Sequence, residues 1–246
     1  MGEKLKNPPL VEALCEFRFA ENTTWDWIVP GQLYDRIQTD FPERSQIQSV
    51  GFQFPASPNI NSVASIHQLP GRVQLKRADG SAMVQVGHNL LAINQLKPYP
   101  SWEEFSSLIL SILEEYRKVV GNLVLERIGL RYINHLIVPD QLAAISDMIT
   151  LTPPLSGSLA RPIRSFYQRY ETEQDNPKGL LIHQTGTQQD EQANPVFVLD
   201  LDFGSTQVQG LKSAQDVKAW LDLAHERLYE AFIASLNPKL YAEFKG

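Results

Sequence analysis

The chain has 246 residues, of which 43% are hydrophobic and 20% are charged, a composition typical of globular proteins. Its 22 Lys and Arg residues are outnumbered by 28 Asp and Glu residues, and the net charge of −6 disfavours general binding to nucleic acid or anionic membranes. The single cysteine, Cys15, excludes an internal disulfide framework and a zinc site built from several cysteines. No apolar run is long enough to span a bilayer and no secretory signal is recognisable, so we expect a cytoplasmic protein without membrane contact.

The first half of the chain reads as strands between two helices. Residues 10–20 alternate between apolar and polar side chains, as a half-buried strand does. A helix is expected near 31–41, and Ser101, with Glu104 three residues on, caps a longer helix at 101–120. Between the helices, the hydrophobic period predicts strands at 46–54, 62–69, 71–78 and 82–93.

The second half repeats this order. A strand is predicted at 123–135 and a short helix near 140–149. A long helix begins at the Ser213 cap and continues to about residue 235, and a last turn covers Lys239 to Phe244. The strands between the helices are expected at 161–172, 179–186 and 195–204.

The two halves are also similar in residues. The segment IVPGQL at 28–33 resembles IVPDQL at 137–142, Arg18 aligns with Arg131, and the two serine caps align, all at offsets of roughly 110 residues. This similarity predicts an α+β fold of two pseudo-repeated β-α-β(3–4)-α halves, 1–122 and 123–246, in one compact unit. Each half would pack a curved antiparallel sheet on one long helix. The topology resembles the duplicated saddle of the TATA-binding protein and, within each half, helix-grip folds.

One face of each predicted sheet is left to face water or a ligand. If the two first strands lie at the centre, Arg18 and Arg131 form a symmetric pair that could hold a phosphate or carboxylate. The alternative is a solvated surface on which these arginines pair with neighbouring glutamates. The candidate ligand-binding residues are Glu12, Glu16, Arg18, Arg127, Arg131 and His135.

Two weaker candidates involve other chemistry. Asp200 and Asp202 share a strand face and could hold a divalent cation, with His183 on a neighbouring strand as a third ligand. The segment 161–170 mixes arginines with aromatic residues, which could stack on bases, although the acidic run 171–175 follows it. Its candidate nucleic-acid residues are Arg161, Arg164, Phe166, Tyr167 and Arg169.

Both ends of the chain carry motifs of a known kind. The segments NPPLVEALCEFRF at 7–19 and LAHERLYEAF at 223–232 resemble a sporadically distributed family of uncharacterised bacterial proteins of similar length. Arg18 matches the family's F-R-F, and His225 and Glu226 match its H-E pair. The resemblance implies a whole-chain unit without an established activity, and its patchy distribution suggests antiphage or toxin–antitoxin neighbourhoods.

We therefore expect a non-catalytic binding protein, without a cofactor, that uses an exposed sheet face or groove. Its ligand would be a partner protein, a second copy of the chain, a peptide or an anionic ligand. A metal-dependent enzyme acting on a nucleotide or nucleic acid through Asp200 and Asp202 is one alternative, and an RNA-binding module built on 161–170 is another.

Overall fold

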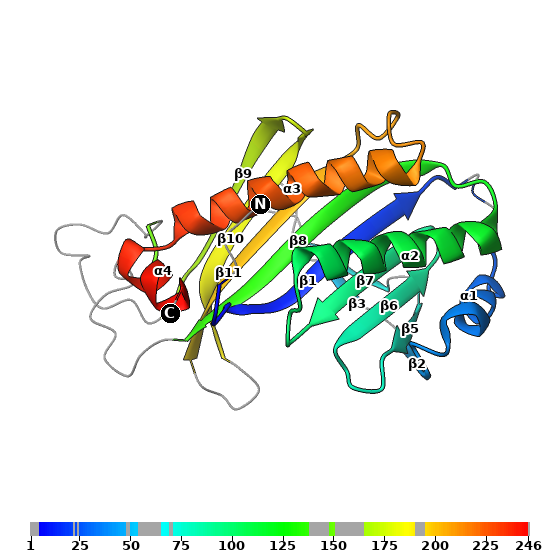
Figure 1. Cartoon of the computed structure of the whole chain (residues 1–246), viewed down its shortest axis with the longest axis horizontal. Coiled ribbons are helices and arrows are strands. Elements are labelled where there is room, and N and C mark those ends of the chain that lie inside the picture. The colour runs from blue at the N-terminus through cyan, green and yellow to red at the C-terminus, as the bar shows by residue number, and fades with distance from the viewer. Residues whose placement is uncertain are drawn as a thin grey trace.

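The fold is α+β, with a large antiparallel sheet and two long helices on one of its faces (Figure 1). The structure, a computed structural model, describes residues 5–21, 23, 25–47, 50–53, 65–68, 71–137, 148–150, 165–189 and 195–245. The described helices are α1 (Val29–Ile37), α2 (Trp102–Val120), α3 (Ala214–Ser235) and α4 (Pro238–Lys245). Among these residues, no helix is both long enough and apolar enough to cross a bilayer.

Nine strands form the large sheet, and two more form a separate hairpin. The strands of the sheet are β1 (Leu10–Phe19), β2 (Glu43–Ile47), β5 (Arg72–Lys76), β6 (Ala82–Gly87), β7 (Leu90–Leu96), β8 (Leu125–Ile137), β9 (Tyr167–Asp175), β10 (Lys178–Gln189) and β11 (Pro195–Ser205). The hairpin pairs β3 (Val50–Gln53) with β4 (Ser65–Gln68). The order across the large sheet is β2-β5-β6-β7-β1-β8-β11-β10-β9, and all its pairings are antiparallel.

The strands predicted for the two halves form one continuous sheet instead of two. β1 and β8, which begin the two halves, pair with each other at the centre. This pairing satisfies backbone groups that would otherwise lie on an exposed sheet edge in each half. Outward from the centre, the order is β7, β6, β5 on one side and β11, β10, β9 on the other.

The segment predicted as one strand at 82–93 is a tight hairpin of two strands, β6 and β7. The turn contains His88 and Asn89, and the φ angle of Asn89 is 53°, in the left-handed region that asparagine tolerates better than most residues. The sequence hides this turn because β7 is buried on both faces, so its apolar run continues that of β6. The helix predicted near 140–149 lies largely outside the described residues.

The core lies between the sheet and the helices and is continuous across the central strands. The register places Cys15 between Ile93 of β7 and Leu130 of β8, and places Leu130 beside Phe203 of β11; none of these four side chains is exposed. Burial raises the pKa of the Cys15 thiol, which fits a small core residue. Ser101 and Ser213 cap α2 and α3 as predicted, accepting hydrogen bonds from the backbone N–H groups of Glu104 and Asp216.

The helices α2 and α3 run in opposite directions and meet at one end through a cluster of rings, here called the aromatic joint. The Trp102 ring stacks on His225 with 4.3 Å between centroids, and its Nε1 donates a hydrogen bond to Asp222. The Tyr132 hydroxyl lies 2.7 Å from Nδ1 of His225, which can accept its proton while the ring is neutral. Burial lowers the pKa of His225 to about 4, so the ring is neutral at pH 7. The joint consists of Tyr99, Trp102, Phe105, Tyr132 and His225.

The aromatic joint should make stability depend on pH. The pKa of His225 is about 4 in the folded chain and 6.5 without burial, so the folded state binds fewer protons between these values. The joint's contribution is therefore complete above pH 6.5 and lost as the pH falls to 4, which amounts to about 3 kcal/mol. His225→Phe keeps a ring but cannot be protonated. Urea unfolding should show the wild type losing more stability than this variant between pH 7 and 4; equal losses would contradict the assignment.

Candidate binding site

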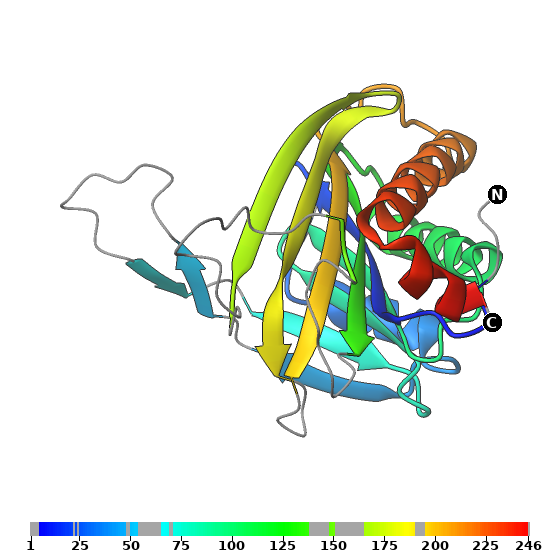
Figure 2. The same ribbon diagram turned by 90° about the vertical axis from the view of Figure 1, so that its left-hand side faces the viewer.

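The candidate site lies on the face of the sheet opposite α2 and α3, here called the open face (Figure 2). Side chains alternate along each strand, so the residues between the core positions of β1 and β8 point to this face. On β1 these are the predicted residues Glu12, Glu16 and Arg18, and on β8 they are Arg127 and Arg131. The alternation predicted from the sequence therefore places these five residues on one surface.

The register of β1 and β8 shows where the predicted symmetric pair of arginines lies. Arg18 lies opposite Arg127, while Arg131 lies opposite Leu14. Arg18 and Arg131 are on two sides of the central Glu16–Gly129 pair, so about four residues of strand, roughly 13 Å, separate their backbones. Each binds its own carboxylate, Arg18 that of Glu16 and Arg131 that of Asp200, and both side chains line one hollow on this face.

Glu16 holds two of the arginines in place. Its carboxylate accepts hydrogen bonds from Nε and Nη2 of Arg18, at 2.8 and 3.1 Å, and from Nη1 of Arg127 at 3.1 Å. The Arg127 guanidinium lies flat over two glycines, since a methyl group at Gly204 would be only 2.7 Å from Nη2, and one at Gly129 3.0 Å from Nη1. The glycines therefore provide the space in which Arg127 lies against the sheet.

Arg131 is occupied by a different acid. It donates two hydrogen bonds to Asp200, from Nε at 2.8 Å and from Nη2 at 2.5 Å, and Gln184 donates a third to the same carboxylate. The hydrogen bond to Asp200 raises the pKa of Arg131. The predicted alternative, arginines paired with neighbouring glutamates, describes Arg18 and Arg127, which bind Glu16, whereas Arg131 binds an aspartate of β11.

Asp202 lies between the two arginine systems. Its side chain is 22% exposed, and Nη2 of Arg127 is 3.9 Å away, beyond hydrogen-bonding distance. Burial raises the pKa of Asp202, although Arg127 and Arg131 oppose that effect. Its carboxylate is thus held near the arginines by charge.

Three arginines, Arg72, Arg18 and Arg127, form a row across the strands of the open face. Along one line across the sheet, Arg72 of β5 is followed by Gly87, Leu90, Arg18 and Arg127. Burial, and then the charge of Arg18, lowers the pKa of Arg72. Beside the row is a hollow of about 350 Å³ lined by Leu14, Glu16, Arg18, Arg127, Gly129, Arg131 and Asp202. Local sequence patterns do not connect Arg72 with Arg18, because the connection depends on the register of four strands.

Two predicted ligand-binding residues lie on the open face away from this hollow. Glu12 accepts a hydrogen bond from Nδ2 of Asn94, which is itself bonded to Gln85. His135 is eight residues along β8 from Arg127. Both belong to the polar surface, and neither lines the hollow beside the arginine row.

The predicted metal ligands do not converge. His183 pairs with Leu201 in the sheet, so it points to the helix face, where Nε2 is 2.8 Å from the Ser235 hydroxyl. Asp200 and Asp202 share the open face, as predicted, but arginines are next to both. No group of three or more His, Cys, Asp or Glu residues suited to a metal ion occurs in the described part of the chain.

The predicted nucleic-acid segment is divided by the fold. Arg161 and Arg164 lie outside the described residues. Phe166 packs against Phe197 with 5.5 Å between ring centroids, and so is not free to stack on a base. Tyr167 is 65% exposed, but its hydroxyl donates to Gln184. Arg169 is bound to Glu171 and to Gln184.

Comparison of the chain with protein-family models and with curated proteins finds no match. The residues and their geometry therefore carry the functional argument.

The partly buried ion pair of Arg131 and Asp200 should be sensitive to removal of one partner. Arg131→Met leaves the Asp200 side chain, which is 11% exposed, with Gln184 as its described partner, and should lower the free energy of unfolding by about 2 kcal/mol. Adding Asp200→Leu should restore most of that loss, because no buried charge then remains. The control is Arg169→Gln, which breaks an exposed pair and should change stability by less than about 0.5 kcal/mol. Urea denaturation measures all three; an Arg131→Met variant as stable as the wild type would contradict the pairing.

Proposed function

We propose that the chain is a non-catalytic binding protein whose open sheet face holds an acidic group of a partner protein. The observation that carries this proposal is the row of Arg72, Arg18 and Arg127 beside a hollow of about 350 Å³. Three cations in line on a rigid sheet form a positive strip in a chain whose net charge is −6. Such a strip attracts and orients acidic groups.

The arginines are fixed before any partner arrives. Glu16 accepts two hydrogen bonds from Arg18 and one from Arg127, while each guanidinium has five N–H donors. Donors therefore remain for a carboxylate or phosphate, and 44% of the Arg18 side chain is exposed. Because Glu16 already restrains these side chains, little conformational entropy is lost on binding.

The wider assignment rests on the pattern of the sequence. We propose that 1–122 and 123–246 are copies of one β-α-β(3–4)-α unit. The matching strand order on the two sides of β1 and β8 supports this proposal. The motifs at 7–19 and 223–232 support membership of the sporadic bacterial family they resemble. A cytoplasmic role in an accessory system, such as defence or toxin–antitoxin, belongs to the same proposal.

An acidic peptide tests the binding face. Titration of hexaglutamate into the protein, followed by calorimetry, should show saturable binding. The binding should weaken as salt rises from roughly 50 to 300 mM, because the Debye length falls by more than half over that range. The Arg18→Gln/Arg72→Gln variant should bind about tenfold more weakly, because two half-buried charges of the row are lost.

The matched control is Arg36→Gln, which removes an exposed arginine bound to Glu115 on the helix side. It should bind the peptide like the wild type. The thermal midpoint of each variant should stay within a few degrees of the wild type. Equal affinity of the Arg18→Gln/Arg72→Gln variant and the wild type, or no binding by either, would contradict the proposal.

A further inference from the structure

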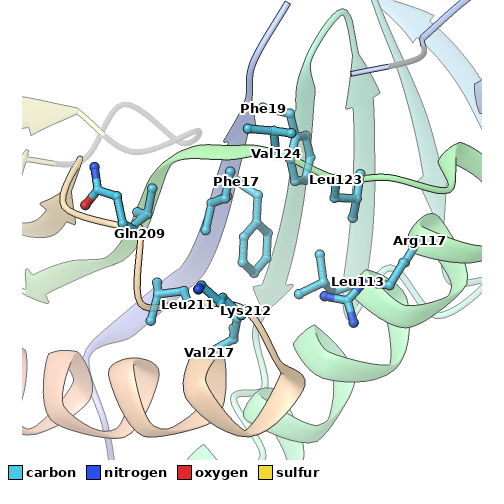
Figure 3. Close-up of a pocket in the computed structure, with 12 residues that line it drawn as sticks. Phe17, Phe19, Leu113, Arg117, Leu123, Val124, Gln209, Leu211, Lys212 and Val217 are labelled. Carbon is cyan, nitrogen blue, oxygen red and sulfur yellow. The ribbon is translucent and has the colours of Figure 1, made fainter. Parts of the chain in front are cut away.

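A separate pocket lies on the helix face of the sheet, where the end of α2 approaches the start of α3 (Figure 3). Its volume is about 460 Å³, within the roughly 300–1,000 Å³ typical of small-molecule sites. Nine of its twelve lining residues are apolar, and Figure 3 shows the Phe17 ring projecting into the space between Leu113 and Leu211. The pocket is therefore a largely apolar cavity at the opposite end of the helix pair from the aromatic joint.

The pocket exists because three side chains at this end are aliphatic, whereas their counterparts in the aromatic joint carry rings. When the Ser213 cap is placed on the Ser101 cap, Val217 takes the position of Phe105, and Leu211 takes that of Tyr99. By the same alignment, Leu113 takes the position of His225. Aliphatic residues thus stand where the aromatic joint has rings, and the helices and sheet leave the space between them unfilled.

Two cationic side chains, Arg117 and Lys212, line this pocket. Arg117 comes from the last turn of α2 and Lys212 from the segment before α3, and Figure 3 shows them on two sides of the cavity. The nearby Asp216 carboxylate is engaged in capping α3, accepting hydrogen bonds from the backbone N–H groups of Lys212 and Ser213. Glu114 is 3.6 Å from Arg117 on an exposed surface, where water weakens the attraction.

We propose that this pocket binds an organic carboxylate with an apolar body, such as a medium-chain fatty acid. The apolar body would lie against the accessible part of the lining, formed by Leu123, Val124 and Leu211, and the carboxylate would lie between Arg117 and Lys212. Filling an apolar cavity replaces poorly held water by dispersion contacts. The two cations select an anion over a neutral or cationic compound of the same length.

The pocket is open to such a ligand from one side. Val124 lines it and is 37% exposed, whereas Phe17 and Val217 at its inner wall are 0% and 2% exposed. A ligand can thus lie beside Val124 on the accessible apolar lining, while Phe17 and Val217 form the closed floor beneath it. The pocket shares no lining residue with the hollow on the open face, so the two sites can be tested independently.

Three ten-carbon compounds test the proposal: decanoate, decanol and decylamine, each below the concentration at which it aggregates. Calorimetry with the whole chain should show saturable binding of decanoate, about tenfold tighter than that of decanol, with decylamine weakest. The Arg117→Gln/Lys212→Gln variant should bind decanoate and decanol equally. The charge-matched control Lys118→Gln/Lys218→Gln, whose residues do not line the pocket, should keep the wild-type preference.

A second variant fills the pocket from within. Leu211→Tyr/Val217→Phe gives this end two of the ring types found in the aromatic joint, and should abolish binding of both decanoate and decanol. No saturable binding of decanoate by the wild type would overturn the proposal. Binding of decylamine as tight as that of decanoate would overturn it too, because the cations would then select nothing. If the filled variant does not fold, the comparison of the two glutamine variants still decides.

Discussion

The antiparallel pairing of β1 with β8 joins segments more than 100 residues apart and makes one sheet of nine strands. It places two buried strands at the centre, so that the core runs without a break from β7 to β11. Both long helices then cover the same face of the sheet. The charged residues between the core positions are left together on the opposite face, because side chains alternate along each strand.

The two faces carry two different kinds of site for that reason. On the open face, polar side chains are fixed by one another: Glu16 restrains Arg18 and Arg127, and Asp200 restrains Arg131. On the helix face, the two ends of the α2–α3 pair are filled unequally, with rings at one end and a cavity of about 460 Å³ at the other.

Local features of the fold could be predicted from the sequence, and distant ones could not. The alternation in β1 and the serine caps of α2 and α3 depend on neighbouring residues, which the sequence displays directly. The contact of Arg127 with Glu16, the position of Arg131 and the face of His183 depend on register between strands. A shift of one residue turns every side chain of a strand to the other face. The cavity was also unpredictable, since its volume depends on side chains from several separate segments.

The register at the centre of the sheet is measured most directly by NMR. Cross-strand nuclear Overhauser effects are expected between Glu16 and Gly129 and between Arg18 and Arg127, and Cys15 should show them to both Leu130 and Ile93. Contacts of Arg18 with the backbone of Arg131, or no contacts between β1 and β8, would contradict the single sheet and the arginine row built on it.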